Sequence, residues 1–442
     1  MEIFLIKAAQ LVLSLSLLVL VHEFGHFIFA RAFKVRVEKF YLFFNPWFSL
    51  FKFKPKNSET EYGVGWLPLG GYCKISGMID ESMDKEQMAQ PPQPYEFRSK
   101  PVGPRLLIMT GGVLFNFLLA LFIYSMILFA WGDTYLPLKN MKMGMDYSDT
   151  FKEIGFRDGD ILLDADGTEL ERLNSATLRA VMNARTVTVL RDGRPATVSI
   201  PEDMAQRVMR DGQGFAAPRV PMAVSRLAGD NTPAARAGLQ SGDRIVAVDG
   251  NPTPTFYDVV LELRRFKAQE VTLSYTRNGH EQSIRLTPDS LGVIGIYSMK
   301  PDELYETVTL TYGFFTSFPA GIRLGVNTLK GYVSDMKHVF SKEGARQIGG
   351  FGAIGNLFPD VWNGRAFWMM TAFLSIILAF MNILPIPALD GGHVLFLLYE
   401  VITRRKPSDK FLEYAQIAGM ILLFTLLIYA NGNDFFRWFR GN

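Results

Sequence analysis

The stretch LVLVHEFGHFIFARAF, residues 18–33, is apolar enough to enter a membrane, yet its centre holds His22, Glu23 and His26. Ionisable side chains are costly inside a bilayer and usually serve a function there. Residues four apart lie on one face of a helix, so His22 and His26 point toward one site. Two neutral imidazoles at that spacing are half of a zinc site.

Glu23 follows the first histidine directly. A carboxylate beside a metal ion can take a proton from water and later give it to a leaving amine. The HExxH pattern therefore predicts hydrolysis, with His22 and His26 as ligands and Glu23 as general base. The alternative is that the three residues only pack between helices through hydrogen bonds.

The composition favours a membrane protein that also carries water-soluble domains. The chain has 442 residues, 48% hydrophobic, and a mean hydropathy of +0.12. A chain of this length usually divides into two or three units. The formal net charge of +3 indicates no nucleic-acid partner. Cys73 is the only cysteine, so the folded parts have no internal disulfide.

Four stretches approach the roughly 20 apolar residues that span a bilayer. They cover residues 3–30, 105–131, 366–387 and 411–430. The first stretch is too long for the core of a signal peptide, and no small-residue cleavage site follows it. We therefore expect an uncleaved anchor.

Basic residues predict the orientation of these spans. Lysine and arginine outnumber the acidic residues in 31–105, and 404–410 adds four more basic side chains. Positive charge marks the cytoplasmic side, so both connections are expected there. Both termini and the whole of 133–365 are then external.

An internal repeat lies within the external region. GFRDGDILLDADG (155–167) and GLQSGDRIVAVDG (238–250) share five residues in register. A helix-like run and alternating β-type segments follow each copy, which predicts two tandem α/β modules. The second copy, from Ala237 to Gly250, resembles the signature of bacterial PDZ domains.

The first copy keeps Gly159, Asp160 and Gly167 but lacks the preceding Pro-Ala element. Its fold is therefore better supported than a ligand-binding role. For both copies the alternative is a small domain without a peptide site.

A catalytic zinc ion needs a third protein ligand. The third span runs in the same direction as the first and ends in NILPIPALDGGH, residues 382–393. Asp390 arrives at the end of the membrane where His22 lies, after Pro385 and Pro387 have broken the helix. We therefore predict Asp390 as the third ligand.

Two alternatives compete with that prediction. Asp390 could instead cap the helix that starts near Gly391, since aspartate is favoured at that position. His393 could be the ligand in its place, although it is expected inside the following helix. His280 and His338 are expected to be ordinary surface residues.

HEFGH in the first span and NILPIPALDG in the third are similar to the signature pair of the site-2 protease family. The resemblance covers nearly the whole chain. It implies one catalytic zinc ion bound by His22, His26 and Asp390, with Glu23 as the general base. It also implies that Asn382 holds the substrate backbone, for which the alternative is a hydrogen bond between helices.

Two further segments match the family. Pro385 and Pro387 correspond to prolines that shape the loop bearing the aspartate. YGVGWLPLGGYCKISGM (62–78) corresponds to a membrane re-entrant β-segment whose edge pairs with an unwound substrate. Its alternation and the Gly70–Gly71 pair by themselves indicate only a hairpin, for which the alternative is a structural loop.

The second span departs from the family pattern. The family often has Gly-Pro-x-x-Asn there, whereas this chain reads GVLFN, Gly112 to Asn116, with Val113 in place of proline. The resemblance therefore implies a role for Asn116 but leaves the local kink in doubt.

We predict a polytopic α-helical membrane protein with four transmembrane helices, a re-entrant β-segment and two tandem PDZ-like α/β domains. The expected parts are transmembrane helix 1 (1–32), the cytoplasmic and re-entrant β region (33–104), transmembrane helix 2 (105–132), PDZ-like domains (133–212 and 213–300), an external membrane-associated helical region (301–365), transmembrane helix 3 (366–392), a cytoplasmic connection (393–410), and transmembrane helix 4 with the tail (411–442).

The resemblance implies a zinc-dependent endopeptidase that cuts transmembrane segments of single-span proteins. Examples are anti-sigma factors already shortened by another protease, and remnant signal peptides. Its implied partners are these substrates, the lipid bilayer, and peptides or C-terminal tails at the PDZ-like domains. It implies the bacterial inner membrane, with the active site near the cytoplasm and the PDZ-like domains in the periplasm.

Two other functions are alternatives to proteolysis. A catalytically inactive PDZ scaffold needs neither Glu23 nor a carboxylate from the parallel span, and both are present. A metal transporter needs several polar positions along a pathway. The second and fourth spans offer little beyond Asn116, Glu413 and Gln416.

Overall fold

The computed structural model describes residues 2–68, 70–78, 90–211, 214–339 and 348–440. The chain divides into two compact units. The helical unit comprises Met1–Gly132 and Thr311–Asn442, and the modular unit comprises Asp133–Leu310. Each unit is described by itself below.

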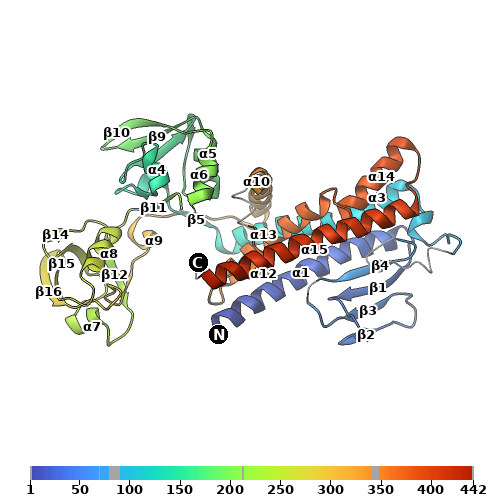
Figure 1. Cartoon of the computed structure of the whole chain (residues 1–442), viewed down its shortest axis with the longest axis horizontal. Helices are drawn as coiled ribbons and strands as arrows, with labels where there is room; N and C mark the ends of the chain where they lie inside the picture. Colours follow the sequence, from blue (N-terminus) through green and yellow to red (C-terminus); the bar gives the residue numbers. More distant parts are fainter. Residues whose placement is uncertain (1, 69, 79–89, 212–213, 340–347, 441–442) are drawn as a thin grey trace. The chain divides into compact units, whose positions relative to one another are not determined.

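Four long helices form the body of the helical unit (Figure 1). They are α1 (Glu2–Ala32), α3 (Val102–Trp131), α13 (Gly364–Ile383) and α15 (Asp409–Arg440). By length and composition, all four contain a segment apolar enough to cross a membrane. The four candidate spans predicted above are therefore confirmed, with ends shifted by a few residues.

Helices α1 and α13 run in the same direction, and α3 runs against them. Leu18 of α1 packs with Leu374 of α13. Further along both helices, His22 contacts Asp390, which follows α13 in the sequence. Glycines allow α1 and α3 to approach closely. A side chain at Gly25 would lie 2.3 Å from the carbonyl oxygen of Gly111, so neither helix tolerates a larger residue there.

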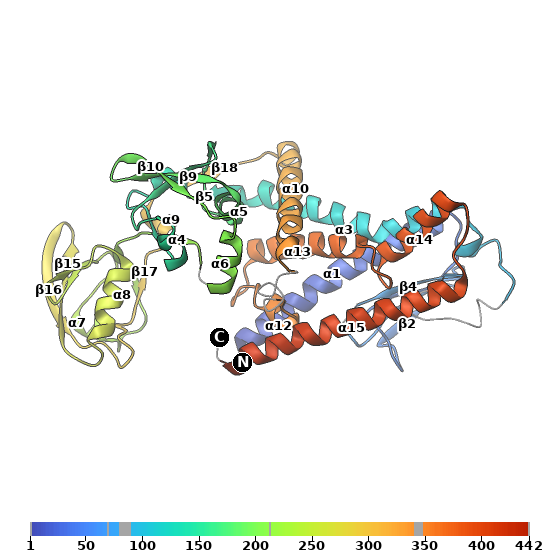
Figure 2. The ribbon, with the colours of Figure 1, turned by 45° about the horizontal axis from the view of Figure 1, so that its top comes forward.

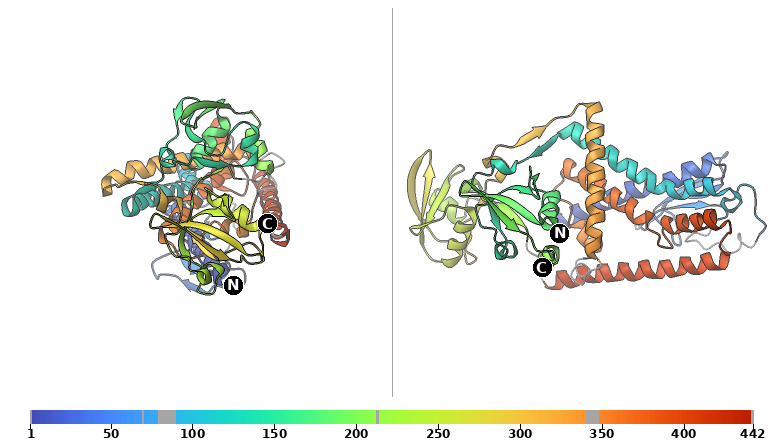
Figure 3. Two further views of the ribbon diagram at one scale, coloured as in Figure 1. Left: turned by 90° about the vertical axis from the view of Figure 1, so that its left-hand side faces the viewer. Right: turned by 90° about the horizontal axis from the view of Figure 1, so that it is seen from above.

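Helix α10 (Phe314–Val339) crosses α3 and α13 steeply in Figure 3. A Cβ at Gly321 would lie 2.2 Å from the Ser125 hydroxyl oxygen of α3, so the two backbones nearly touch. The remaining helices of 301–440 are α9 (Pro301–Leu304), α12 (Phe351–Gly355) and α14 (Asp390–Thr403).

The region 301–365 was predicted as a membrane-associated helical region, and it also contains a strand, β18 (Val308–Leu310). That strand pairs antiparallel with β5 (Asp133–Tyr135), so the first and last strands of the modular unit lie side by side. The partners are far apart in sequence, and a local pattern carries no information about such a pairing.

A four-stranded sheet lies beside the C-terminal half of α1 (Figure 1). Its strands are β1 (Val37–Leu42), β2 (Phe51–Phe53), β3 (Glu61–Val64) and β4 (Tyr72–Ile75), in the order β2-β3-β1-β4. The hairpin expected within 62–78 is wrong, because β1 lies between β3 and β4 and pairs with both. Strand β4 is therefore an edge strand.

The modular unit contains two copies of one α/β arrangement, each with its own apolar core (Figure 2). The first copy consists of β6 (Met145–Tyr147), α4 (Asp149–Glu153), β7 (Ile161–Ala165), β8 (Thr168–Glu169), α5 (Ser175–Asn183), β9 (Thr186–Arg191), β10 (Arg194–Ser199), α6 (Met204–Asp211) and β11 (Ala216–Pro218). The second consists of β12 (Met222–Leu227), α7 (Pro233–Ala237), β13 (Arg244–Val248), β14 (Asn251–Pro252), α8 (Phe256–Arg265), β15 (Val271–Arg277), β16 (His280–Leu286) and β17 (Ile296–Ser298). Two short 3-10 helices, η1 (Phe97–Ser99) in the helical unit and η2 (Leu138–Asn140) in the modular unit, complete the elements of the described residues.

The strand pairing repeats along with the sequence. Strand β11 pairs with β6 in the first copy as β17 pairs with β12 in the second. The first copy therefore ends near Pro218 rather than at the predicted boundary of 212. Residues 212 and 213 themselves lie outside the described residues.

The same buried ion pair organises both copies. Asp160 accepts from the Arg191 guanidinium at 2.9 and 2.7 Å, and Asp243 accepts from Arg277 at 2.7 and 2.6 Å. Each aspartate is 1% exposed and also accepts from a backbone N–H three residues before it. The aspartate of the GD motif is thus the centre of each module, which explains why the repeat retains it.

We expect Asp243→Asn to destabilise the second copy, because the amide replaces one acceptor oxygen of the buried carboxylate with an NH2 group and removes the charge that faces the Arg277 guanidinium. Hydrogen exchange of the full-length protein, followed over the copy that carries the substitution, measures the change. Asp203→Asn, in the first copy, is the control. Its pair with Arg207 is exposed to solvent, so its loss should change stability little. Equal effects of the two variants would contradict the prediction.

Candidate metal centre

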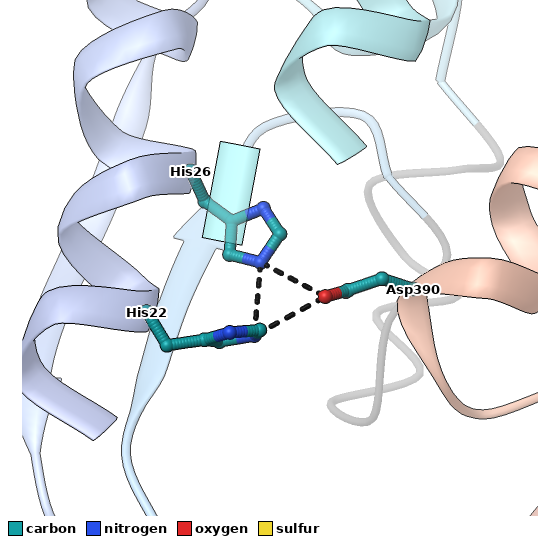
Figure 4. A group of neighbouring side chains, drawn as sticks. All are labelled: His22, His26 and Asp390. Atoms are coloured by element: carbon teal, nitrogen blue, oxygen red, sulfur yellow. Dashed lines mark hydrogen bonds and ion pairs between the residues drawn. The ribbon is translucent and has the colours of Figure 1, made fainter. Parts of the chain in front are cut away.

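Three side chains from two elements converge at one point in the helical unit (Figure 4). His22 and His26 project from successive turns of α1, and Asp390 is the first residue of α14. The Asp390 Oδ2 atom lies 3.1 Å from His22 Nε2 and 3.4 Å from His26 Nε2. The two Nε2 atoms are 3.2 Å apart.

This triangle fits a tetrahedral metal ion. Zinc bonds to histidine nitrogen and carboxylate oxygen of about 2.0–2.1 Å place neighbouring ligands about 3.3 Å apart. The three observed edges, 3.1, 3.2 and 3.4 Å, match that spacing. Asp390 Oδ2 is buried and finds no hydrogen bond, which is costly unless a cation satisfies it.

Helix α3 supports the tautomer of each histidine that a metal requires. His26 Nδ1 lies 2.8 Å from the Ile108 carbonyl oxygen and can only donate to it, which leaves Nε2 with its lone pair. His22 Nδ1 lies 3.3 Å from Asn116 Nδ2, and the Asn116 Oδ1 atom has no hydrogen-bond partner among the described residues. A flip of the side-chain amide exchanges these two atoms. With the amide oxygen turned toward Nδ1, His22 donates to Asn116 and its Nε2 is also free.

Glu23 and the two histidines line one cavity, and this cavity has a volume of about 550 Å³. The backbone N–H of Cys73, in the edge strand β4, donates to the Glu23 carboxylate. Gly71, just before β4, packs against α1. A Cβ there would lie 2.7 Å from Val19 Cγ1. Strand β4 therefore forms one wall of the cavity, directly beside the candidate base.

The other residues expected at the site are placed as follows. Asn382, in the last turn of α13, lines the cavity together with Gly70 and Gly71. Pro385 and Pro387 lie in the connection between α13 and α14, where they allow the chain to turn before Asp390. Within the described part of the chain, neither proline lines the cavity.

The helix-cap alternative for Asp390 does not match this geometry. Leu389 occupies the N-cap position of α14, no side chain caps the helix, and Asp390 is its first residue. His393 lines the cavity one turn further on but is not one of the three converging side chains. Of the histidines outside the site, His280 is exposed on β16, and the side chain of His338 lies outside the described residues.

Sequence reasoning missed the contribution of Gly112 and Ile108. A Cβ at Gly112 would lie 2.4 Å from His26 Nε2, so only glycine leaves room for the imidazoles. The adjacent glycines of the second span were a signal for close helix packing. The Ile108 carbonyl carried no signal, since any residue type supplies one.

Comparison with known proteins places these features in a family. The sequence model of peptidase family M50 matches residues 10–426. The regulator of sigma-E protease RseP of Escherichia coli is 29% identical over 465 residues, covering 98% of this chain and 99% of its own. A putative zinc metalloprotease of Neisseria meningitidis is 26% identical, covering 96% and 98%.

One solved structure is similar over a short part of the chain. It is the PDZ domain of the SdrC-like protein of Listeria monocytogenes, 25% identical, which covers 19% of this chain and 93% of that domain with a TM-score of 0.16.

We expect Gly112→Ala to weaken zinc binding by about 10- to 100-fold, the range seen when the surroundings of metal ligands are changed. The added methyl group would displace both imidazoles. Titration of metal-free protein with zinc measures the effect. Gly103→Ala, in the first turn of the same helix, meets no atom within 4 Å and serves as the control. Wild-type affinity in Gly112→Ala would contradict this role.

Proposed function

Because the chain belongs to peptidase family M50, the site-2 protease family, we propose that it hydrolyses peptide bonds within the membrane-spanning segments of single-span proteins. It is a zinc metalloendopeptidase. The observation that supports cleavage within the membrane is the position of the site. Three potential ligands and one further carboxylate share a cavity among helices that are themselves apolar enough to span a membrane.

His22, His26 and Asp390 would hold a single zinc ion. When bound, that ion supplies Lewis acidity toward water and toward the scissile carbonyl group. Glu23 accepts a proton from the attacking water at its carboxylate and delivers it to the leaving amine. The three ligand side chains are nearly buried, and this exclusion of solvent strengthens each electrostatic interaction with the substrate.

A transmembrane helix satisfies its own amide groups, so the substrate must unwind before water can attack. Strand β4 offers an edge along the cavity, to which an extended segment can add as a further strand. Asn382 offers an amide. Its side chain makes no hydrogen bond within the described residues, which supports a role in holding substrate over the alternative of a helix–helix bond.

The substrates are single-span proteins from which most of the external domain has been removed, such as a pre-cleaved anti-sigma factor or a remnant signal peptide. A name given to several relatives, regulator of sigma-E protease, supports the first of these. The two PDZ-like modules screen candidates by size or by binding peptides and C-terminal tails.

The protein resides in the bacterial inner membrane, with the site near the cytoplasm and the modules in the periplasm. The basic residues of 31–105 and 404–410 support this orientation, because both flank the end of the spans where the candidate ligands lie.

We expect Glu23→Gln to abolish cleavage of a single-span substrate that carries a helix-weakening residue, while about one zinc ion per chain remains bound. The amide cannot accept the proton, but the ligands are intact. Cleavage and zinc content are measured on the same detergent-purified samples. A wild type that binds zinc but cuts no member of a varied substrate panel would favour the scaffold function instead.

Asn382→Leu is expected to lower kcat/KM by about 10-fold, the loss of roughly one hydrogen bond to the substrate backbone. Zinc content and thermal stability should not change, because the amide has no hydrogen-bond partner among the residues that the structure describes. Unchanged cleavage, or a fall in stability as large as the fall in rate, would contradict the substrate role.

A further inference from the structure

A buried ion pair joins α3 to α14 away from the cavity. The Arg105 Nη2 atom, in the first turns of α3, lies 2.6 Å from Glu400 Oε1, near the end of α14. The side chains are only 8% and 12% exposed. The Arg105 Nε atom has no hydrogen-bond partner among the described residues. Glu400 therefore satisfies only part of the hydrogen-bonding capacity of the guanidinium.

Such a pair is not explained by stability alone. Removing two charges from water costs several kcal/mol per ion, and an apolar pair of similar volume is often as stable. Apolar surroundings are available, because Ile108, Met109 and Leu397 form a buried cluster between the same two helices. The pair is therefore expected to supply something that apolar packing cannot.

The ion pair can fix the position of α14 along its own axis relative to α3. Apolar contacts are non-directional, so on their own they do not single out one pair of atoms along the two helices. A 2.6 Å hydrogen bond between charged groups fixes one point of α14 against one point of α3. Glu400 lies ten residues after Asp390, and at 1.5 Å per residue the rigid helix transmits this position over about 15 Å.

The same turn of α3 also holds the other side of the site. Arg105 lies one turn before Ile108, whose carbonyl oxygen accepts from His26. One segment of α3 thus contacts a candidate ligand on α1 directly and reaches the candidate ligand on α14 through the ion pair. The opposite end of α14 is held separately, by tight packing of Gly391 against the Leu384 carbonyl oxygen.

We propose that Arg105 and Glu400 are positioning residues that set the reach of Asp390 into the metal centre. This inference rests on the zinc site of the proposed function. It assigns neither residue a contact with zinc, with substrate or with the reacting water.

The test compares zinc affinity and the visible spectrum of the cobalt-substituted protein in full-length variants. Glu400→Gln is expected to bind zinc about 10- to 100-fold more weakly and to shift the cobalt bands, because Asp390 no longer sits at bonding distance. Arg105→Lys, which keeps the charge but loses the guanidinium geometry, should show an intermediate loss. The exchanged pair Arg105→Glu with Glu400→Arg should regain most of the affinity.

Lys7→Met is the matched control, since it breaks the Lys7–Asp360 pair that also joins two segments of the helical unit. It should leave zinc affinity and the cobalt spectrum unchanged. Thermal unfolding of every variant identifies any that fails to fold, in which case the exchanged pair and Arg105→Lys decide the question.

A folded Glu400→Gln with wild-type zinc affinity and cobalt spectrum would overturn the positioning role and leave the metal site standing. A folded exchanged pair that regains nothing would overturn it as well. Wild-type protein that binds no zinc or cobalt would overturn the metal site itself, and the positioning role with it.

Discussion

Three lone pairs meet within 3.4 Å of one another in a nearly buried part of the helical unit, and the rest of that unit is arranged around them. With both imidazoles neutral and their Nε2 lone pairs turned inward, the two nitrogens and the carboxylate oxygen repel one another, and each has lost water. A divalent ion removes both costs. The structure is therefore best understood as a support that holds these atoms at metal-binding distance.

Helix α3 provides most of that support without contributing a ligand. Its glycines let it approach α1 closely enough for a backbone carbonyl and an amide side chain to orient the two imidazoles. Hydrogen bonds of this kind decide which ring nitrogen faces the metal. The valine that replaces the family's proline in GVLFN leaves α3 helical through the site, and Asn116 still reaches His22.

The modular unit follows a different principle. Each of its two copies encloses an apolar core and holds a buried aspartate that pairs with an arginine, and the repeat extends from the sequence to individual hydrogen bonds. The first and last strands of the unit pair with each other, so both connections to the helical unit leave from one two-stranded ribbon.

Local pattern predicted the four apolar spans, the HExxH face and the duplication, because each depends on residues within one helix, one turn or one repeat. The same reasoning left 62–78 as a hairpin or a loop and predicted a helical region at 301–365. It missed the strands of both segments, whose partners lie elsewhere in the chain. The sequence by itself thus determined which segments are apolar and which side chains carry chemistry. Only the tertiary structure decided that Asp390 rather than His393 completes the triangle, and that an edge strand lies beside Glu23, because both depend on how segments distant in the sequence pack together.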